Sequence, residues 1–428
     1  MNIQEFPTDH NFLNVQRANK ILNILRTTFL KNEPGRIVAK RLENVDLIPD
    51  KTAVFALGKA AESMAAGISE TNFRSSKLKI ILAPFAVNSS DSDLKIFKGN
   101  HPIPLADSYE STRKIMNLLQ NAKEENLIVL LSGGASALFE LPESGIDDQT
   151  FSNITKCLLN AGTDIESLNA LRCGISSVKC GKILQKLNFN RYMVLLISDV
   201  PSNELYLIGS NPFAVHHFNF GSIKSSCIPE DLRPVANSYN LNHESKTDME
   251  LILSGEIFAD SLTANIKMYS DQYDILSLGQ ILIGDIMEVS KKLPLILRKI
   301  FAEKGKPFWF TGFGETTAKV NGNGKGGRNT ELSLRIMLEM NKNEVFSLMS
   351  TATDGDDGNS GLMGMMVDDK LKRETLNTDF KGYLDKSDSA GFARRYSVQV
   401  ETGFTGTNVS DIIIGYYGGY NENINREK

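Results

Sequence analysis

The sequence has few of the residues that mark metal-binding, disulfide-rich or membrane-spanning proteins. Its 428 residues include only four cysteines and five histidines. No apolar run reaches the roughly 18–20 residues that a membrane-spanning helix needs. Basic and acidic side chains nearly balance, at 47 and 51, so the formal charge is −4. We therefore expect neither a membrane protein nor the broad basic surface that nucleic-acid binding requires.

The cysteines are too few and too far apart in the sequence for a disulfide framework or a CxxC zinc site, so we expect small buried side chains. They are Cys157, Cys173, Cys180 and Cys227. The histidines form no HExxH pattern, which argues against a catalytic metal held by histidine. They are His10, His101, His216, His217 and His243. Residues 1–9 are polar and partly acidic, unlike a secretory signal, so a cytoplasmic location is the expectation.

The first part of the chain has the pattern of a layered α/β domain. The length favours two or three domains, and residues 11–30 have the apolar spacing of an amphipathic helix. Short apolar runs then alternate with glycine turns and helical patterns. These predicted strands are residues 52–57, 79–83, 127–131 and 193–197. Such alternation is typical of a parallel sheet covered on both faces, so we predict a doubly wound, Rossmann-like α/β domain.

The pattern changes twice further along the chain. Residues 211–306 read as mainly helical, with the clearest helix over 279–300, and short strands with glycine turns follow Pro307. We predict strands over 308–310, 316–320 and 345–350 and a helix over 329–339. The predicted domains are therefore residues 1–300, including a helical segment at about 230–300, and a smaller mixed α/β domain over residues 301–428.

Four candidate segments of the first domain follow predicted strands or lie on a helix. Lys59 follows Gly58 at a strand-to-helix turn, where a cation and free amides suit an anion. Ser132, Gly133, Gly134 and Ser136 form a glycine loop that a phosphate could approach closely. Arg172 lies on a predicted helix, and Asp199 ends a predicted strand. The ordinary alternatives are a surface lysine, a tight turn, a solvated basic face and a helix cap.

The second domain carries the densest group of candidates. A glycine-rich loop of Gly324, Lys325, Gly326 and Gly327 ends in Arg328 at a predicted helix start, after the strand that holds Glu315. A planar arginine beside helix amides suits an anion. Asp354, Asp356 and Asp357 form an acidic loop without the spacing of a calcium loop, and such a loop suits Mg²⁺.

These residues fit phosphoryl transfer, which needs positioning and charge neutralisation more than covalent chemistry. Asp199 stands alone at a strand end, which suits a proton acceptor, and Asp354 has neighbouring carboxylates, which suits a metal-side residue; the two roles could be exchanged. The chain is thus predicted to be a phosphate-handling α/β enzyme.

Eight segments, in fixed order, resemble the glycerate 2-kinase family whose C-terminal part is called the MOFRL domain. They are ALGKA at 56–60, GNHPIPLADS at 99–108, LLSGGASALFELP at 130–142, SLNALRCGISSVKCGK at 167–182, LISDVPSNELYLIGSNP at 196–212, GFGETTAKVNGNGKGGRNTELSL at 312–334, TATDGDDG at 351–358 and TGFTGTNVSDI at 402–412.

The resemblance implies transfer of the ATP γ-phosphate to the 2-hydroxyl of D-glycerate, with Mg²⁺. Because Lys59 and Arg328 lie in different predicted domains, we expect the active site in a cleft between the two. The resemblance also implies functional roles for Lys59 and Arg328, which together with Arg172 are the expected substrate-binding residues. The expected ATP-binding residues are Ser132, Gly133, Gly134, Ser136, Glu315, Gly324, Lys325, Gly326 and Gly327, and the expected metal ligands are Asp354 and Asp356. Expected partners are these small molecules, with no nucleic acid or membrane. The oligomeric state stays open, with a homodimer as one option.

The chain departs from the family pattern at Ala135 and Cys180, which replace glycines, and at Asn211-Pro212-Phe213. These departures bear on the acceptor more than on the reaction class. Two alternatives stay open: a kinase for another hydroxy acid, such as an aldonic or 2-keto-3-deoxy acid, and a catalytically silent nucleotide or metabolite sensor. Relatives are sometimes labelled hydroxypyruvate reductase, but no GxGxxG with a following acidic residue supports nicotinamide binding.

Overall fold

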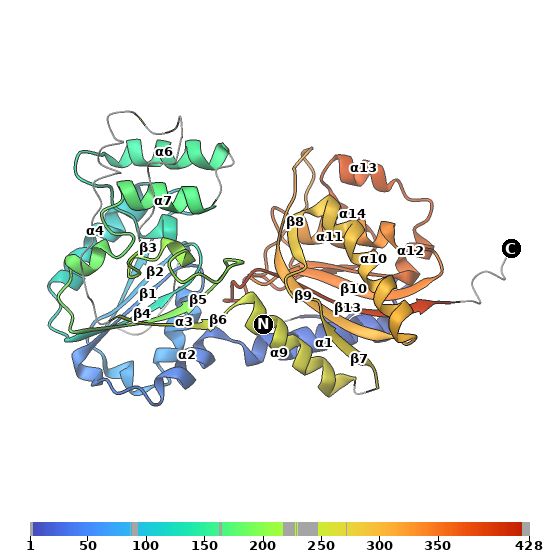
Figure 1. The fold of residues 1–428 in the computed structure, drawn as a ribbon, viewed down its shortest axis with the longest axis horizontal. Coiled ribbons are helices and arrows are strands. Elements are labelled where there is room, and N and C mark those ends of the chain that lie inside the picture. The colour runs from blue at the N-terminus through green and yellow to red at the C-terminus, as the bar shows by residue number, and fades with distance from the viewer. Residues whose placement is uncertain are drawn as a thin grey trace. The chain divides into compact units, whose positions relative to one another are not determined.

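The chain folds as two units, one of which interrupts the other in the sequence. The computed structural model describes residues 3–85, 87, 93–161, 165–216, 227, 229, 247–270 and 272–421. The inserted unit comprises Glu33–Leu253, and the terminal unit comprises Met1–Asn32 with Ser254–Lys428. Each unit has its own sheet (Figure 1). No helix among the described residues combines the length and apolarity needed to cross a membrane.

The inserted unit is built on a six-stranded parallel sheet in the order β3-β2-β1-β4-β5-β6. This is the strand order of a doubly wound sheet, so the predicted fold class is confirmed. The strands are β1 (Thr52–Leu57), β2 (Lys79–Ala83), β3 (Leu94–Lys98), β4 (Asn126–Leu131), β5 (Arg191–Ile197) and β6 (Thr247–Leu253). The helices are α2 (Pro34–Leu42), α3 (Ala61–Ile68), α4 (Ala106–Gln120), α5 (Ala135–Leu138), α6 (Asp148–Asn160) and α7 (Ile165–Ile175).

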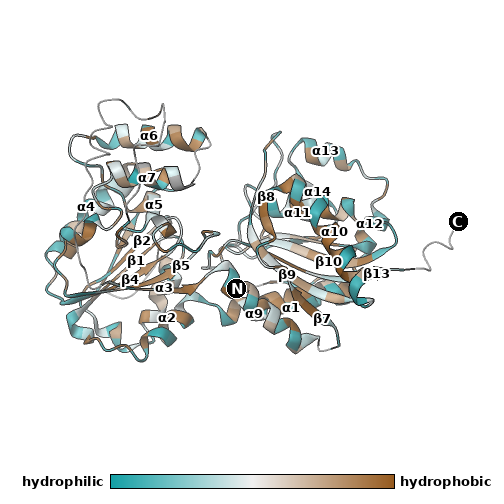
Figure 2. Ribbon diagram, viewed as in Figure 1, coloured by the Kyte–Doolittle hydropathy of each residue, from teal (hydrophilic) through white to brown (hydrophobic). Residues whose placement is uncertain are grey.

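Burial explains why these strands are apolar throughout. Every residue of β1 and β2 is buried, as are all but the first residues of β4 and β5. Figure 2 shows the hydrophobic colour running along these strands. A strand covered on both faces has no solvent side, so it lacks the alternation of a half-exposed strand. The four strands predicted from apolar runs are confirmed to within two residues.

The terminal unit contains a mixed sheet in the order β12-β11-β10-β13-β9-β7, with β8 also paired to β9. Its strands are β7 (Asp274–Ser277), β8 (Leu282–Asp285), β9 (Phe308–Thr317), β10 (Glu344–Ala352), β11 (Gly364–Asp368), β12 (Gln399–Val400) and β13 (Asp411–Tyr420). Its helices are α1 (Val15–Lys31), α9 (Gly255–Tyr269), α10 (Ile286–Lys304), α11 (Arg328–Glu339), α12 (Asp369–Glu374), α13 (Phe380–Asp385) and α14 (Ser389–Arg395).

The chain divides elsewhere than at the boundary expected near residue 300. The first helix and everything from Ser254 onward belong to one unit. The physical reason is packing: α1 lies against α9, where the Phe29 and Phe258 rings are 4.9 Å apart, and β7 and β8 pair with β9. Periodicity along the sequence does not reveal that a first helix packs against segments more than 200 residues away.

The stretch over 211–306 is mainly helical in its described part, through α9 and α10, but it also contains three strands that were not expected. Residues 217–226, 228, 230–246 and 271 lie outside the described residues, and the strands β6, β7 and β8 lie within the described part. The helix expected over 279–300 begins only at Ile286, because Leu282–Asp285 pairs with β9. The strands expected over 308–310 and 316–320 are one strand, β9. Strands of four residues are too short to show a period.

Candidate active site

The loops that follow β1 and β4 meet in the inserted unit. These neighbouring strands lie where the strand order reverses, which is where doubly wound sheets bind ligands at the carboxyl ends of their strands. The Lys59 N–H donates to the Gly133 carbonyl at 2.9 Å, and the Ala60 N–H donates to Ser132 Oγ at 3.0 Å. The structure thus brings together two segments that the sequence singled out separately.

Gly134 lies directly against Lys59 and His101. Its φ of +86° is in the left-handed region, and a Cβ there would lie 3.1 Å from Lys59 Cγ and 3.4 Å from His101 Cδ2. Burial lowers the pKa of His101 to about 4, and the charges of Lys59 and Arg172 add to this effect. His101 is therefore neutral at pH 7. Sequence reasoning considered it only as a metal ligand; its position in the GNHPIPLADS segment was the available signal.

Asp199 lies on the other side of the glycine loop. It follows β5, and a Cβ on Gly133 would overlap its carboxylate. A glycine is therefore required at position 133 for this carboxylate to reach the loop. Lys59 thus lies against Gly134 and Asp199 against Gly133, so a cation and an anion flank the same turn.

The glycine loop offers backbone donors that remain unused within the described part of the chain. Among the described residues, none accepts a hydrogen bond from the N–H groups of Gly133, Gly134, Ala135 or Ser136. Ser136 Oγ lies 2.9 Å from Ser210 Oγ, within hydrogen-bond distance. Consecutive free amides are a suitable cradle for a phosphate or a carboxylate.

Arg172 is buried beside two further charged side chains. It is only 6% exposed, so the alternative of a solvated basic helix face is wrong for this residue. Lys179 is fully buried and donates to the carbonyls of Ala135 and Gly209, at 3.1 and 3.5 Å. Burial raises the pKa of Glu140 to about 6, although Lys179, Ser176 and Arg172 oppose the shift. Burial likewise lowers the pKa of Lys179 to about 8.

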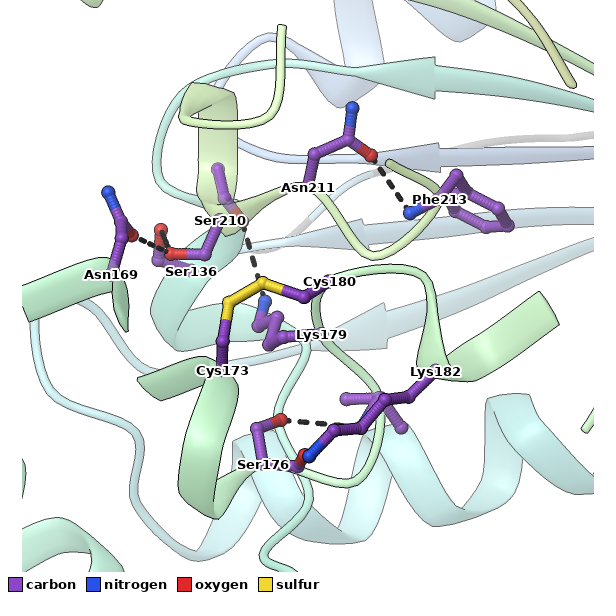
Figure 3. Close-up of a disulfide and its surroundings, with 12 residues drawn as sticks. Ser136, Asn169, Cys173, Ser176, Lys179, Cys180, Lys182, Ser210, Asn211 and Phe213 are labelled. Atoms are coloured by element: carbon purple, nitrogen blue, oxygen red, sulfur yellow. Dashed lines mark hydrogen bonds between the residues drawn. A yellow bond between two sulfur atoms is a disulfide. The ribbon is translucent and has the colours of Figure 1, made fainter. Parts of the chain in front are cut away.

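The cysteines are paired, which corrects the expectation of unpaired buried side chains. Disulfides join Cys157 to Cys227 and Cys173 to Cys180, with Cα atoms 5.6 and 5.7 Å apart. Figure 3 shows the second disulfide beside Lys179. Cys180 has a φ of +53°, which explains why a glycine would suit this position. Spacing in the sequence could not show which Cα atoms come within bridging distance.

The other departures from the family pattern are accommodated by packing. Asn211 Oδ1 accepts from the Phe213 N–H at 2.9 Å, and the Phe213 ring is fully buried in the core under the sheet. Ala135 is buried, and a Cβ on Gly209 would lie 2.8 Å from its methyl group. His216 stacks on Tyr206, with ring centroids 3.6 Å apart, whereas His217 and His243 lie outside the described residues.

A second group of candidates gathers at one end of the sheet in the terminal unit. Arg328, the first residue of α11, forms a two-point ion pair with Asp411 at 2.5 and 3.1 Å and also pairs with Glu315. Asp411 opposes Gly314 of β9 and Ala352 of β10 in register. Burial alone would lower the pKa of Arg328, but Asp411 and Glu315 raise it, so the guanidinium stays charged. Asp411 was not predicted as a site residue, although it lies in the TGFTGTNVSDI segment.

The glycine-rich loop before α11 is held by the protein itself. All four of its N–H groups donate internally: Gly324 to the Lys386 carbonyl (2.8 Å), Lys325 to Asp388 Oδ1 (3.1 Å), Gly326 to Asn359 Oδ1 (2.8 Å) and Gly327 to Thr330 Oγ1 (3.0 Å). These amides are therefore engaged, unlike those of the Ser132–Ser136 loop. The expected ATP contacts of this loop stay a prediction.

The acidic loop divides into a structural and an open part. Asp357 is buried and caps α11, accepting from the N–H groups of Asn329 and Thr330 at 2.9 and 2.8 Å. Asp354 is half-buried and its Oδ1 accepts from the N–H of the exposed Asp356. Across the described ranges, no three His, Cys, Asp or Glu side chains are arranged to hold a metal ion. Asp354 and Asp356 nevertheless fit a hydrated Mg²⁺, which needs one or two protein carboxylates.

Comparison with known proteins covers nearly the whole chain. Residues 20–253 match a family described as a domain of unknown function, DUF4147, and residues 309–411 match the MOFRL family. The chain is 34% identical to the glycerate 2-kinase of Picrophilus torridus, over 93% of this chain and 96% of that protein. It is 28% identical to the D-glycerate 2-kinase of Thermotoga maritima, over 89% and 94% of the two chains.

Solved structures agree. The crystal structure of glycerate kinase from Thermotoga maritima superposes with a TM-score of 0.83 at 26% identity, covering 93% of this chain and 99% of that one. A structure from Pyrococcus horikoshii gives a TM-score of 0.74 at 26% identity, covering 94% and 98%. The two matched regions and the 34% identity along nearly the full length lead to one conclusion: this chain is an enzyme of the glycerate 2-kinase family.

Proposed function

We propose that this enzyme transfers the γ-phosphoryl group of ATP to the 2-hydroxyl of D-glycerate, giving 2-phosphoglycerate and ADP. The observation that carries the proposal is the full-length similarity to proteins named glycerate 2-kinase. The glycine loop of the inserted unit supports it, because Lys59, Arg172 and the amides that no described residue uses suit anionic substrates.

In this proposal, the residues of the inserted unit position the acceptor and accept its proton. Lys59 neutralises negative charge beside Gly134, and Asp199 accepts the hydroxyl proton as the phosphoryl group is transferred. Asp354 and Asp356 of the terminal unit would hold Mg²⁺, which supplies charge neutralisation at the phosphate oxygens. Arg328 is oriented by Asp411 and Glu315 and contributes a fixed positive charge.

The test is an assay coupled through enolase without phosphoglycerate mutase. Enolase acts on 2-phosphoglycerate, so a signal with D-glycerate and MgATP identifies both the reaction and the position. A signal that appears only after mutase is added would point to the 3-hydroxyl instead. A panel of aldonic and 2-keto-3-deoxy acids tests the alternative acceptors, and no ADP from any of them would leave the silent sensor as the better explanation.

Two variants and one control make the assay specific for the site. Lys59→Ala and Asp199→Asn should each lower kcat/KM at least ~10²-fold, which corresponds to about 2.7 kcal/mol of lost transition-state stabilisation. Lys51→Ala is the matched control, because Lys51 precedes the opposite end of β1 and pairs with Glu125 at the surface. Retention of more than about a third of the wild-type activity in Lys59→Ala would place that lysine outside the site.

A further inference from the structure

Asn169 carries a buried hydrogen-bond donor that no described residue uses. The residue lies on α7 and is 1% exposed. Its Oδ1 accepts from Ser210 Oγ, which fixes the orientation of the amide (Figure 3). Its Nδ2 is buried and has no hydrogen-bond partner among the described residues. Buried polar groups are nearly always paired, so an oriented donor without an acceptor points to a ligand.

Arg172 is the second unused donor on the same helix. Residues three apart on a helix share a face, so Arg172 neighbours Asn169. The residue is 6% exposed, and its guanidinium forms neither a hydrogen bond nor an ion pair with any residue in the described part of the chain. Its opposing charge is Glu140, which uses Oε1 to accept from Ser176 Oγ and from the Leu141 N–H. A buried arginine whose planar donors are free is poised for an anion.

The surroundings limit the charge of that anion. Arg172, Lys59 and Lys179 supply three positive charges near the site, whereas Glu140 and Asp199 supply two negative charges. The excess is a single positive charge, which matches a monoanion better than a polyphosphate. A planar guanidinium and an amide also match the two coplanar oxygens of a carboxylate.

We propose that Asn169 Nδ2 and the Arg172 guanidinium bind the carboxylate of the hydroxy-acid acceptor, which makes Asn169 a specificity-determining residue of this enzyme. The inference rests on the proposed function for the identity of the acceptor. Ser210 positions Asn169 by donating to Oδ1, and through Ser136 it links the subsite to the start of α5.

The first experiment measures binding of D-glycerate by calorimetry in the absence of nucleotide. Asn169→Asp keeps the oxygen that accepts from Ser210 but replaces the free donor with an oxygen. We expect binding at least 10-fold weaker than in the wild type, with the KM for ATP changed less than twofold. Asn153→Asp is the matched control, because Asn153 is exposed on α6 and its Oδ1 also accepts a side-chain hydrogen bond. Unchanged D-glycerate binding in a folded Asn169→Asp would overturn the proposal.

The second experiment uses the wild-type protein and therefore does not depend on the folding of a variant. His101 is affected by the charge of Arg172, so a carboxylate bound at the subsite should raise its pKa. Histidine-labelled protein, with His101 assigned through His101→Gln, should show this rise by NMR on saturation with D-glycerate and none with glycerol. A rise with inorganic phosphate but not with D-glycerate would assign the subsite to a phosphate and overturn the proposal.

The two proposals fail in different ways. If the wild-type protein binds D-glycerate and shows the His101 response but transfers no phosphoryl group, the proposed function fails and the subsite stands. If the wild type phosphorylates D-glycerate while Asn169→Asp binds and reacts like the wild type, the subsite fails and the proposed function stands.

Discussion

We expect Arg328 to affect both the activity of the enzyme and the folding stability of the terminal unit. Its guanidinium forms a two-point pair with Asp411, whose carboxylate is only 2% exposed. Burial raises the pKa of Asp411 to about 7, although Arg328 favours the charged form. Removing one member of a buried pair leaves the other charge without compensation, so a loss of activity in an Arg328 variant has two explanations.

Arg328→Ala should therefore lower the free energy of unfolding as well as the activity. We expect a loss of about 3 kcal/mol in urea unfolding, because Asp411 would be left buried and unpaired. The double variant Arg328→Ala/Asp411→Asn should recover most of that stability while remaining inactive. Recovery of activity together with stability would show that Arg328 has only a structural role.

Glu140 should give the inserted unit a measurable dependence of stability on pH. Burial raises its pKa to about 6 from the ordinary value of 4.5, so the folded state holds this proton more tightly than the unfolded state. Glu140 therefore contributes about 2 kcal/mol to the free energy of unfolding below about pH 4.5, and this contribution is lost as the pH rises through 6. Glu140→Gln lacks the titration.

The measurement is the difference in unfolding free energy between the wild type and Glu140→Gln, taken from urea titrations at several pH values. The wild type should lose stability relative to Glu140→Gln between pH 4 and 7. A constant difference over this range would mean that the carboxyl group titrates near its ordinary pKa in the folded protein.

At the scale of elements, the two glycine loops differ in how their backbone amides are bonded. The loop before α5 has free amides and lies against Asp199, whereas the loop before α11 has all four of its amides bonded and is packed against the acidic loop. A Cβ on Gly133 would overlap the Asp199 carboxylate, and a Cβ on Gly327 would overlap backbone of Asp357. Neither glycine has a positive φ, so a Cβ at either position would be opposed by these contacts and not by backbone strain.

Gly133→Ala should lower kcat/KM at least ~10²-fold with less than about 1 kcal/mol of lost stability, because the displaced group is a side chain of the site. Gly327→Ala should reduce the free energy of unfolding by about 2 kcal/mol, since the neighbouring atoms are the Asp357 backbone and the Cγ of its carboxylate, which caps α11. Activity assays and thermal unfolding of both variants decide the matter. Equal effects on stability would show that the two loops serve the same structural purpose.

The elements that the sequence predicts are those whose burial leaves a pattern. The strands β1, β2, β4 and β5 were predicted because both of their faces are covered, and Lys59, Ser132 and Asp199 were singled out because each follows such a strand. β7 and β8 were missed because they have four residues each and are mostly exposed or half-buried. Because these two strands are short and only partly buried, they show neither the apolar run nor the alternation from which a strand is predicted.

Contacts between distant residues could not be predicted in the same way. His101 owes its neutral ring to burial and to Lys59 and Arg172, and Asp411 owes its role to Arg328, 83 residues earlier. Neither pairing leaves a local signal. The cysteine pairs are a similar case, since one of them joins residues 70 positions apart.

At the scale of the whole molecule, both disulfides lie in the inserted unit, and the terminal unit has no cysteine. In the chain-entropy model the bridge with a sequence separation of 70 stabilises by about 4 kcal/mol and the bridge with a separation of 7 by about 2 kcal/mol. Such bonds are uncommon in reducing compartments, so the expected cytoplasmic location stays a prediction.

A strong reductant should therefore destabilise one unit only. Differential scanning calorimetry should show a transition that moves to lower temperature on reduction and another that does not. Cys157→Ser should account for more of the shift than Cys180→Gly, because its loop is longer and because glycine suits the φ of +53° at position 180. A uniform shift of the whole unfolding profile would contradict this division.

The insertion of one unit within the other has a consequence for how the protein is made. The α1 helix is synthesised before the inserted unit, yet α9, against which it packs, belongs to the segment that starts at Ser254, about 220 residues after Asn32. Translation proceeds at roughly 5–20 residues per second, so the inserted unit takes some 10–45 s to synthesise. During this time the apolar side chains of α1 have no α9 to pack against. These side chains include Ile21, Leu22, Leu25 and Phe29. The nascent chain therefore carries an amphipathic helix whose apolar face stays uncovered during this interval, and a ribosome-associated chaperone could cover it.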